Sequence, residues 1–244
     1  MKLLSELFLK IDGENKSILF GIPNSQGEME KMFLLRQEVY KRNNYISTES
    51  DKDEYDKDGK STYFIAKIGD DVIGTVRLIK DIPLPTQKEC FDFQEPKEMK
   101  EISLVNRAEL SRLISIPYKG KIYLPRHLIL LFLIDCICEY AQQKDILGGY
   151  SFITSKLYDK MTKIRIPFHI VKNFKQKYPP TGLMYPYFNK KDNQIVPIYY
   201  KLDEIKGYLE NLFKNKRMFE KIGENKIRLK DNLYNRFLKF LKII

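Results

Sequence analysis

The sequence predicts a mixed α/β (α+β) fold, in which one central sheet of mixed strand directions carries helices on its faces. Short apolar runs with strand composition alternate along the chain with segments of helical periodicity. Two of these runs are joined by a tight Gly-Asp-Asp turn, which is the pattern of a β-hairpin. We expect this domain to cover residues 1–202 and a basic helical extension to follow at 203–244.

The first elements are a strand and a helix. "SILFGIPN" is a short apolar run closed by Pro-Asn, which is typical of a strand. Ser25 and Glu28 then have the spacing of a capping box, and an apolar helical stripe follows. Arg36 falls on that stripe. A guanidinium on the inward face of a helix requires a carboxylate or a ligand, so Arg36 is a candidate functional residue.

The remaining elements complete the sheet. The hairpin is "TYFIAKIGDDVIGTVRLI", with Arg77 in its second strand, and a proline-spotted loop leads from it to the strand "AELSRLISI". "PRHLILLFLIDCICEYAQQK" is a helix that is apolar on most sides and has proline in its first turn. The last elements are the strand "ILGGYSFITS", the short helix "KLYDKMTKIR", and the strands "FHIVKNF" and "VPIYYKL".

Charge and cysteine content limit the function classes. The 244 residues include 43 basic and 32 acidic residues, and the net charge of +11 favours an acidic partner such as nucleic acid, anionic lipid or an acidic carrier protein. No helix-turn-helix, zinc or RNP-type motif occurs, so we expect no nucleic acid partner. Three cysteines cannot form a disulfide framework, which favours a reduced, cytoplasmic location. Neither the N-terminal stretch nor "HLILLFLIDCIC" has the pattern of a signal peptide or a membrane span.

The tail from Asp203 onward has a different composition. It contains eleven Lys or Arg against six Asp or Glu. An apolar spacing at Leu229, Leu233, Phe237 and Leu241 predicts an amphipathic helix packed on the domain. A docking surface for an acidic partner, or peripheral contact with a membrane, is the alternative interpretation of this helix.

The acidic stretch "ESDKDEYDKDG" resembles the first half of a calcium-binding EF-hand loop. In that register the twelfth position, which needs a bidentate Glu, falls on Ile65, and a strand follows where a helix is required. We therefore expect no metal. The stretch is either a solvated turn or part of a polar site.

Six charged residues form a pattern across elements that should be neighbours. They are Arg36, Asp53, Asp56, Arg77, Glu109 and Arg112. Three arginines and three carboxylates can neutralise one another, as partly buried charges require. A purely structural ion-pair network is one interpretation of this set, and a polar active site is the other.

The segments that carry these charges resemble a known group of enzymes. "LLRQEVYKRNNY", "ESDKDEYD", "GTVRLI" and "ELSRLISI" are similar, in order and spacing, to the acyl-homoserine-lactone (autoinducer) synthases and the related long-chain N-acyl amino acid synthases. These families share the GNAT acyltransferase fold, and the resemblance covers roughly residues 29–155. It implies a transferase that moves an acyl group from an acyl carrier protein thioester to the amine of an amino acid or a related acceptor, with no bound cofactor.

The resemblance also assigns expected roles. Glu109 and Arg112 would be catalytic, and the substrate-binding residues would be Arg36, Tyr40, Tyr45, Asp53, Asp56, Arg77 and Ser111. The lactone synthases usually have phenylalanine and tryptophan where this chain has Tyr40 and Tyr45, which weakens the lactone assignment and leaves acyl transfer untouched. The neighbouring Asp51, Glu54 and Asp58 are expected to be solvated.

The expected chemistry needs a base and an oxyanion site but no covalent nucleophile, because a thioester is already activated. Glu109 is the candidate to take the ammonium proton, directly or through water, which requires a raised pKa or a water relay. Strict alternation places Glu109 and Arg112 on opposite faces of their strand. They share a site only if a β-bulge intervenes, and its free N–H would then serve the oxyanion.

The donor is inferred from a missing motif. GNAT enzymes that use coenzyme A generally carry a glycine-rich turn for the pyrophosphate, whereas "PYKGKIYLPRH" has a single glycine. This favours acyl carrier protein over acyl-CoA. The alternatives are a lactone synthase, a CoA-dependent N-acetyltransferase and a non-catalytic basic binding protein.

Overall fold

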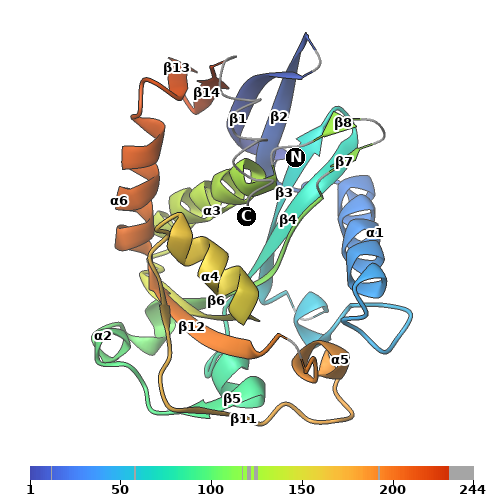
Figure 1. The fold of residues 1–244 in the computed structure, drawn as a ribbon, viewed down its shortest axis with the longest axis vertical. Helices are drawn as coiled ribbons and strands as arrows, with labels where there is room; N and C mark the ends of the chain where they lie inside the picture. The colour runs from blue at the N-terminus through green and yellow to red at the C-terminus, as the bar shows by residue number, and fades with distance from the viewer. Residues whose placement is uncertain are drawn as a thin grey trace.

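The fold is built on one large twisted sheet with helices on both faces (Figure 1). The computed structural model describes residues 1–230, except 12, 58, 117, 120, 121, 124, 125 and 192. Its ten-stranded sheet has the order β10-β12-β9-β6-β4-β3-β2-β1-β14-β13. The described part of the chain also contains two small two-stranded sheets, β11-β5 and β7-β8.

The bounds of these elements are as follows. The strands are β1 (Lys2–Ile11), β2 (Glu14–Ile22), β3 (Ser61–Ile68), β4 (Asp71–Ile79), β5 (Phe91–Phe93), β6 (Arg107–Ser115), β7 (Tyr118–Lys119), β8 (Ile122–Tyr123), β9 (Gly148–Thr154), β10 (Phe168–Ile170), β11 (Phe174–Gln176), β12 (Ile195–Lys201), β13 (Phe219–Gly223) and β14 (Lys226–Leu229). The helices are α1 (Gln26–Arg42), α2 (Lys97–Lys100), α3 (Arg126–Gln142), α4 (Ser155–Lys163), α5 (Tyr185–Phe188) and α6 (Leu202–Phe213), with single turns η1 (Glu54–Asp56), η2 (Thr86–Cys90) and η3 (Leu104–Asn106).

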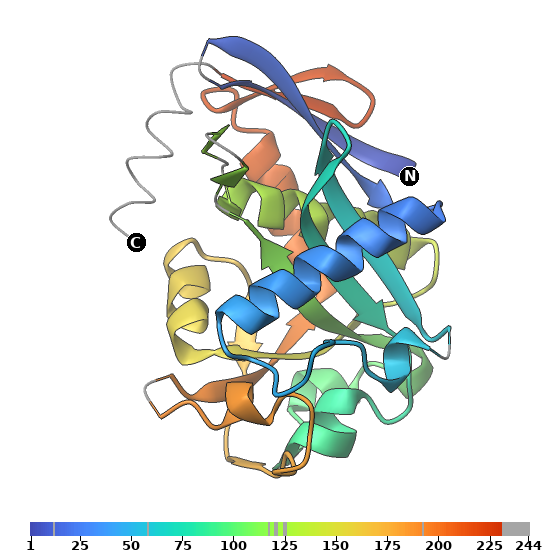
Figure 2. The same ribbon diagram turned by 90° about the vertical axis from the view of Figure 1, so that its right-hand side faces the viewer.

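Helices α1 and α3 cover opposite faces of the sheet. Successive side chains of a strand point to opposite faces, and on β3 Phe64 joins the apolar cluster that contains α3, while Ile65 joins the cluster that contains α1. Figure 2 shows α1 crossing in front of the strands. Ser25 caps α1 by accepting a hydrogen bond from the Glu28 N–H, as the capping-box spacing predicts.

The predicted fold class is confirmed. The hairpin appears as β3 and β4, the arginine helix as α1, and the long apolar helix as α3. Most neighbouring strands of the large sheet are antiparallel, while β6 pairs with β9, and β1 with β14, in parallel. None of the helices in the described ranges is long and apolar enough to cross a membrane.

Three regions differ from the expectation. The N-terminal residues form β1, which the sequence did not indicate, and the proline-spotted loop contains the turn η2 and the strand β5. The stretch 203–229 is helical only in α6, because β13 and β14 form a hairpin that extends the sheet beside β1. Leu229 therefore ends a strand, and Leu233, Phe237 and Leu241 lie outside the described residues. The division of the chain at 202/203 stays a prediction.

Candidate active site

The site is organised by a β-bulge in β6. Along the β4–β6 pair, Thr75 faces Ile114 and Arg77 faces Ser111, so one residue of β4 opposes two of β6 in the interval. Arg112 lies in this interval with φ +55°, a left-handed conformation that is uncommon for a side chain of its size. The bulge that the sequence required is present, and it turns Arg112 to the α1 face, where its guanidinium lies 5.1 Å from the centre of the Tyr40 ring.

A cavity opens where β6 and β9 separate. The parallel pairing between these strands ends at Glu109 and Tyr150. Beyond that point the residues of β6 from Leu110 and of β9 from Ser151 line a cavity of about 220 Å³. The separation leaves backbone groups of both strands facing a space that a ligand can fill.

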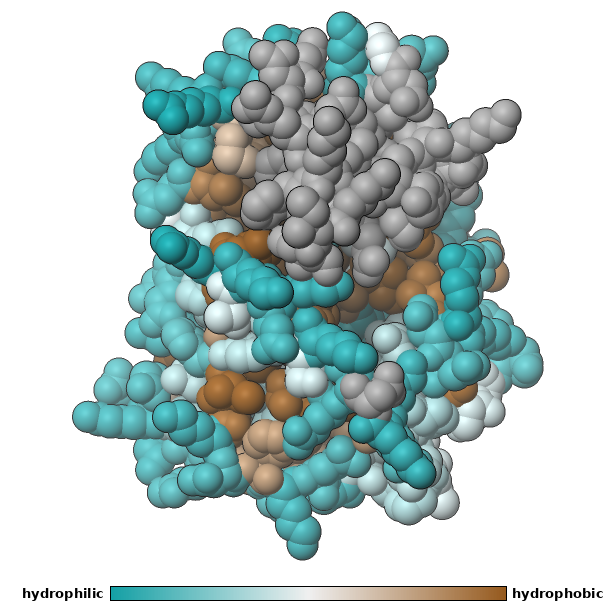
Figure 3. Space-filling model, viewed as in Figure 1, coloured by the Kyte–Doolittle hydropathy of each residue, from teal (hydrophilic) through white to brown (hydrophobic). Residues whose placement is uncertain are grey.

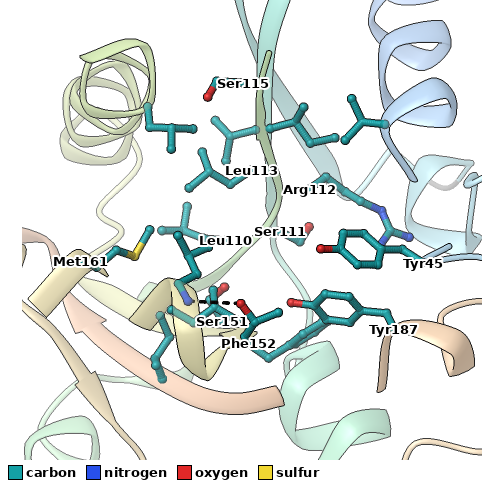
Figure 4. Close-up of a pocket in the computed structure, with 18 of the residues that line it drawn as sticks. Tyr45, Leu110, Ser111, Arg112, Leu113, Ser115, Ser151, Phe152, Met161 and Tyr187 are labelled. Carbon is teal, nitrogen blue, oxygen red and sulfur yellow. Dashed lines mark hydrogen bonds between the residues drawn. The ribbon is translucent and has the colours of Figure 1, made fainter. Parts of the chain in front are cut away.

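The two ends of this cavity differ in chemistry. One end is polar and aromatic, with Tyr40, Tyr45, Ser111, Arg112 and Tyr187. The other is apolar and lies under α3 and α4, where it is lined by Leu130, Ile134, Leu157, Met161 and Phe168. Figure 4 shows Tyr45, Arg112 and Tyr187 at one side of the cavity and Met161 at the opposite side.

Behind the polar end, Arg36 joins two aspartates. Its Nε donates to Asp51 Oδ2 at 2.7 Å, and its two terminal nitrogens donate to the two oxygens of Asp56, both at 2.9 Å. The side chains of Arg36 and Asp56 are 0% exposed and that of Asp51 is 1% exposed. A planar guanidinium between two carboxylates is the arrangement that makes three buried charges tolerable.

Arg77 links this group to the bulge. Its terminal nitrogens donate to the two oxygens of Asp53 at 2.6 and 2.8 Å, and its Nε donates to Ser111 Oγ at 2.9 Å. Asp53 Oδ2 also accepts a hydrogen bond from Arg112 at 3.0 Å. Arg36, Asp51, Asp53, Asp56, Arg77 and Arg112 therefore form one continuous network of three positive and three negative side chains.

The network holds Asp56 and Arg77 in their charged forms. Burial raises the pKa of Asp56, but the hydrogen bonds from Arg36 and the charge of Arg77 outweigh it and hold that pKa well below its usual range. Burial lowers the pKa of Arg77, and the hydrogen bonds to Asp53 reverse this and raise it overall. At neutral pH both groups are ionised, so the polar end of the cavity is backed by fixed charges.

Glu109 lies on the same face of the sheet as the network, but outside the cavity lining. It is buried beneath η2, and its Oε2 accepts a hydrogen bond from the Thr86 N–H at 2.6 Å. Burial raises its pKa to about 8, while the Thr86 N–H and the charge of Arg77 act in the opposite direction. This raised pKa is the property the sequence argument required of a base that works near neutral pH. Glu109 is nevertheless not among the residues that line the cavity.

Arg112 is the charged group exposed to the cavity. One terminal nitrogen donates to Asp53 and to the Asp51 carbonyl, and the other lies 2.9 Å from Met184 Sδ. Its buried Nε has no hydrogen-bond partner and is 3.6 Å from Asp51 Oδ2. Arg112 thus brings a positive charge to the cavity wall, which is suited to an anionic ligand group.

The nine predicted site residues therefore fall into three groups. Tyr40, Tyr45, Ser111 and Arg112 line the cavity. The network residues Arg36, Asp53, Asp56 and Arg77 stand behind it, and Glu109 is enclosed beside it. Asp51 was expected to be solvated, and this expectation is wrong because Asp51 is buried against Arg36. Glu54 is exposed as expected, and Asp58 lies outside the described residues.

Sequence reasoning missed the second wall of the cavity. Ser151, Phe152 and Thr154 on β9, together with Met161 and Tyr187, have no spacing motif and lie outside or at the edge of the charged segments. The apolar strand composition of β9 and its position after the long helix α3 were the available signals. In the described ranges no group of three or more His, Cys, Asp or Glu side chains is arranged to hold a metal ion.

A bulged strand beside a splayed parallel neighbour, with a cavity between them, is the arrangement of the GNAT-like fold. Comparison with known proteins agrees. The family model "N-acyl amino acid synthase FeeM" matches residues 31–140, the segment that carries α1, the aspartates, β4 and the bulge. None of the curated proteins compared with the chain matches it.

Several solved structures are similar to this chain. The acyl-homoserine-lactone synthase LasI has 17% sequence identity and a TM-score of 0.52, over 80% of this chain and 95% of that chain. The CoA-dependent acyl-homoserine lactone synthase MesI has 14% identity and a TM-score of 0.49, over 75% of this chain and 86% of that chain. Escherichia coli ElaA has 12% identity and a TM-score of 0.48, over 75% of this chain and 98% of that chain.

These findings confirm the predicted resemblance and the predicted class of enzyme. The family match and the GNAT-like fold indicate an acyltransferase whose acceptor is an amine.

Proposed function

We propose that the protein transfers a fatty acyl group from an acyl carrier protein thioester to the amine of an amino acid or a closely related acceptor. The observation that carries this proposal is the two-ended cavity between β6 and β9. Its apolar end suits an acyl chain, its polar end suits a charged acceptor, and the bulge lies between them. A thioester carbonyl placed at the bulge would therefore have its acyl chain in the apolar end and the acceptor amine at the polar end.

The acceptor is assigned to the polar end. Arg112 is the charged residue of the cavity lining and would pair with an acceptor carboxylate, and Asp53 fixes its guanidinium from behind. Tyr40 and Tyr45 are in edge contact, as are Tyr45 and Tyr187, so three aromatic rings form a continuous wall beside Arg112. Arg36, Asp56 and Arg77 act at a distance in this proposal, as the groups that hold Asp53 and Arg112 in place.

The reaction requires one proton to leave the ammonium group before attack. The freed amine attacks the thioester carbonyl, the C–N bond forms, the C–S bond breaks, and the departing thiolate takes up a proton. The bulge interrupts the regular ladder between β4 and β6, and in this proposal its backbone N–H groups stabilise the oxyanion. Glu109 lies outside the cavity lining, so in this proposal the ammonium proton reaches it through a water molecule and not by direct contact.

The net charge of the chain supports acyl carrier protein as the carrier of the acyl group. Carrier proteins are strongly acidic, and the net charge of this chain is +11. Helix α4 contributes Leu157 and Met161 to the cavity, and the same short segment carries Lys160, Lys163 and Arg165 at or near the surface. Figure 3 shows a predominantly hydrophilic surface over α4. Acyl-CoA as donor is the alternative that the experiment separates.

The experiment is production of the protein in a bacterial host, followed by mass spectrometry of extracted lipids. We expect new N-acyl amino acids with the wild-type protein and a loss of at least about 100-fold with Glu109→Gln. Asp135→Asn is the matched control, because burial also raises the pKa of Asp135, to about 7, and Asp135 lies on α3 outside the cavity lining. Purified enzyme with acyl carrier protein or acyl-CoA donors then identifies the carrier. Absence of any acylated amine with soluble wild-type protein and both donors would overturn the proposal.

A further inference from the structure

A second, smaller cavity lies beyond the apolar end of the first. It measures about 20 Å³ and is enclosed by α3, α4 and the turn that follows α4. Four residues line both cavities, and they are Leu130, Ile134, Leu157 and Met161. These shared side chains are the partition between the two spaces, so whichever of them moves most easily controls whether the spaces join.

Met161 is the most adaptable part of this partition. Leucine and isoleucine are branched, whereas methionine has an unbranched side chain with three rotatable bonds that adapts to irregular gaps. Met161 is 4% exposed and belongs to the main apolar cluster. In Figure 4 it extends from α4 at the end of the cavity opposite Tyr45 and Tyr187. A change of rotamer at this one residue would alter the length of the cavity.

The size of the cavity makes this partition matter for an acyl chain. An apolar protein cavity of about 150 Å³ accommodates benzene, which has six carbon atoms. By the same ratio, about 220 Å³ accommodates about nine non-hydrogen atoms. Because the acceptor occupies the polar end of the same cavity, the acyl chain receives only part of this volume, and a long chain would have to displace Met161.

We propose that Met161 determines the acyl chain length that the enzyme accepts, and that long acyl chains pass it into the gap between α3 and α4. This inference rests on the proposed function, because it assigns the apolar end of the cavity to the acyl group. The gap beyond Met161 is lined by the apolar Leu131, Ile164 and Ile166 and by the polar Lys160 and His127. Its lining is thus mostly apolar.

The test compares donors within each variant, so that loss of stability cancels. The measured quantity is the ratio of kcat/KM for tetradecanoyl to that for octanoyl carrier protein. We expect Met161→Ala to raise this ratio at least about tenfold, since it removes three side-chain heavy atoms from the partition. We expect Met161→Phe to favour shorter chains. The ratio of kcat/KM for octanoyl to that for butanoyl carrier protein should fall at least about fivefold.

Met99→Ala is the matched control. Met99 is completely buried in a separate apolar cluster with Tyr150 and lines neither cavity, so the same substitution there should leave the ratio unchanged. Calorimetric binding of octanoate and tetradecanoate to the same variants tests the inference without catalysis. Ratios and affinities that stay within about twofold of wild type in both Met161 variants would overturn the inference. Its failure is distinct from failure of the proposed function, in which wild-type protein transfers no acyl group from any donor.

Discussion

The two ends of the cavity are built on opposite principles. At the polar end, each charged side chain of the network is fixed by its neighbours, as Arg36 is by Asp51 and Asp56. At the apolar end, residues such as Met161 and Phe168 are held by packing alone. Hydrogen-bonded charges impose one geometry, whereas apolar packing tolerates changes of shape when volume is kept. We therefore expect the acceptor end to be intolerant of substitution and the acyl end to be adjustable.

The largest effect is expected from a substitution that disrupts the charged network at the polar end. Arg36→Ala leaves Asp51 and Asp56 buried without their shared partner, and removing one member of a buried ion pair costs about 3–5 kcal/mol. Urea unfolding monitored by circular dichroism measures this loss. Arg228→Ala is the control, because Arg228 and its partner Glu220 are each 51% exposed and such surface pairs contribute about 0–1 kcal/mol. Equal losses in the two variants would show that the network is not a structural unit.

The next effect concerns the enclosed carboxyl. If Glu109 is the proton acceptor, kcat/KM rises as pH increases through about 8, where Glu109 ionises, and Glu109→Gln lowers activity by about 10²–10⁴. The stability of the wild type should have the opposite pH dependence. A folded-state pKa raised above the unfolded value means that stability falls as pH rises from about 4.5 to about 8.

A pH series of thermal melting temperatures tests the second part. Glu109→Gln should flatten that series, since glutamine does not titrate in this range. An unchanged pH–rate profile in an active Glu109→Gln variant would remove Glu109 from the mechanism and leave the proton to a group in the cavity.

A smaller effect is expected from a change that keeps the charge of Arg112. Arg112→Lys retains one positive charge but loses the Nε donor and the planar fork, so KM for the acceptor should rise about tenfold. KM for the acyl donor should change little, because the donor chain occupies the other end. Steady-state kinetics with each substrate varied in turn makes the measurement. A rise confined to the donor would place the acceptor elsewhere.

The last effect concerns charges outside the cavity, and it depends on salt. Reversing two charges with Lys160→Glu and Lys163→Glu should lower kcat/KM for an acyl carrier protein donor by about tenfold at low salt, and less at high salt. A short acyl-pantetheine thioester, which lacks the carrier protein, should be used equally well by the variant and the wild type. The same loss with both donors would mean that the substitutions disturb α4 and not docking.

The sequence predicted the polar end better than the apolar one. Local signals identify Arg36, because a guanidinium on an apolar stripe is anomalous, and the need for Glu109 and Arg112 to share a face required the bulge. Asp51 was assigned wrongly because nothing in an acidic run distinguishes the carboxylate that folds under Arg36 from those that face solvent. The path of the loop after α1 determines which of these carboxylates is buried.

The apolar end of the cavity could not be predicted from the sequence, for a different reason. Met161 and Phe168 look like ordinary core residues, and their part in a cavity depends on the separation of β6 from β9, which is a property of three-dimensional packing. The strands β13 and β14 were likewise missed, because β14 pairs with β1 from the opposite end of the chain. Pairings across such a sequence distance leave no local pattern.

The charge balance of the network has a consequence for turnover. Three guanidinium groups and three carboxylates sum to zero, so an amino acid in its zwitterionic form would bind without changing the net charge of the site. Acylation abolishes the ammonium charge and leaves an anion. In the proposed reaction this anion lies beside a guanidinium whose charge Asp53 already neutralises. Formation of the amide bond therefore weakens the electrostatic fit that admitted the acceptor, and chemistry itself would promote release of the product.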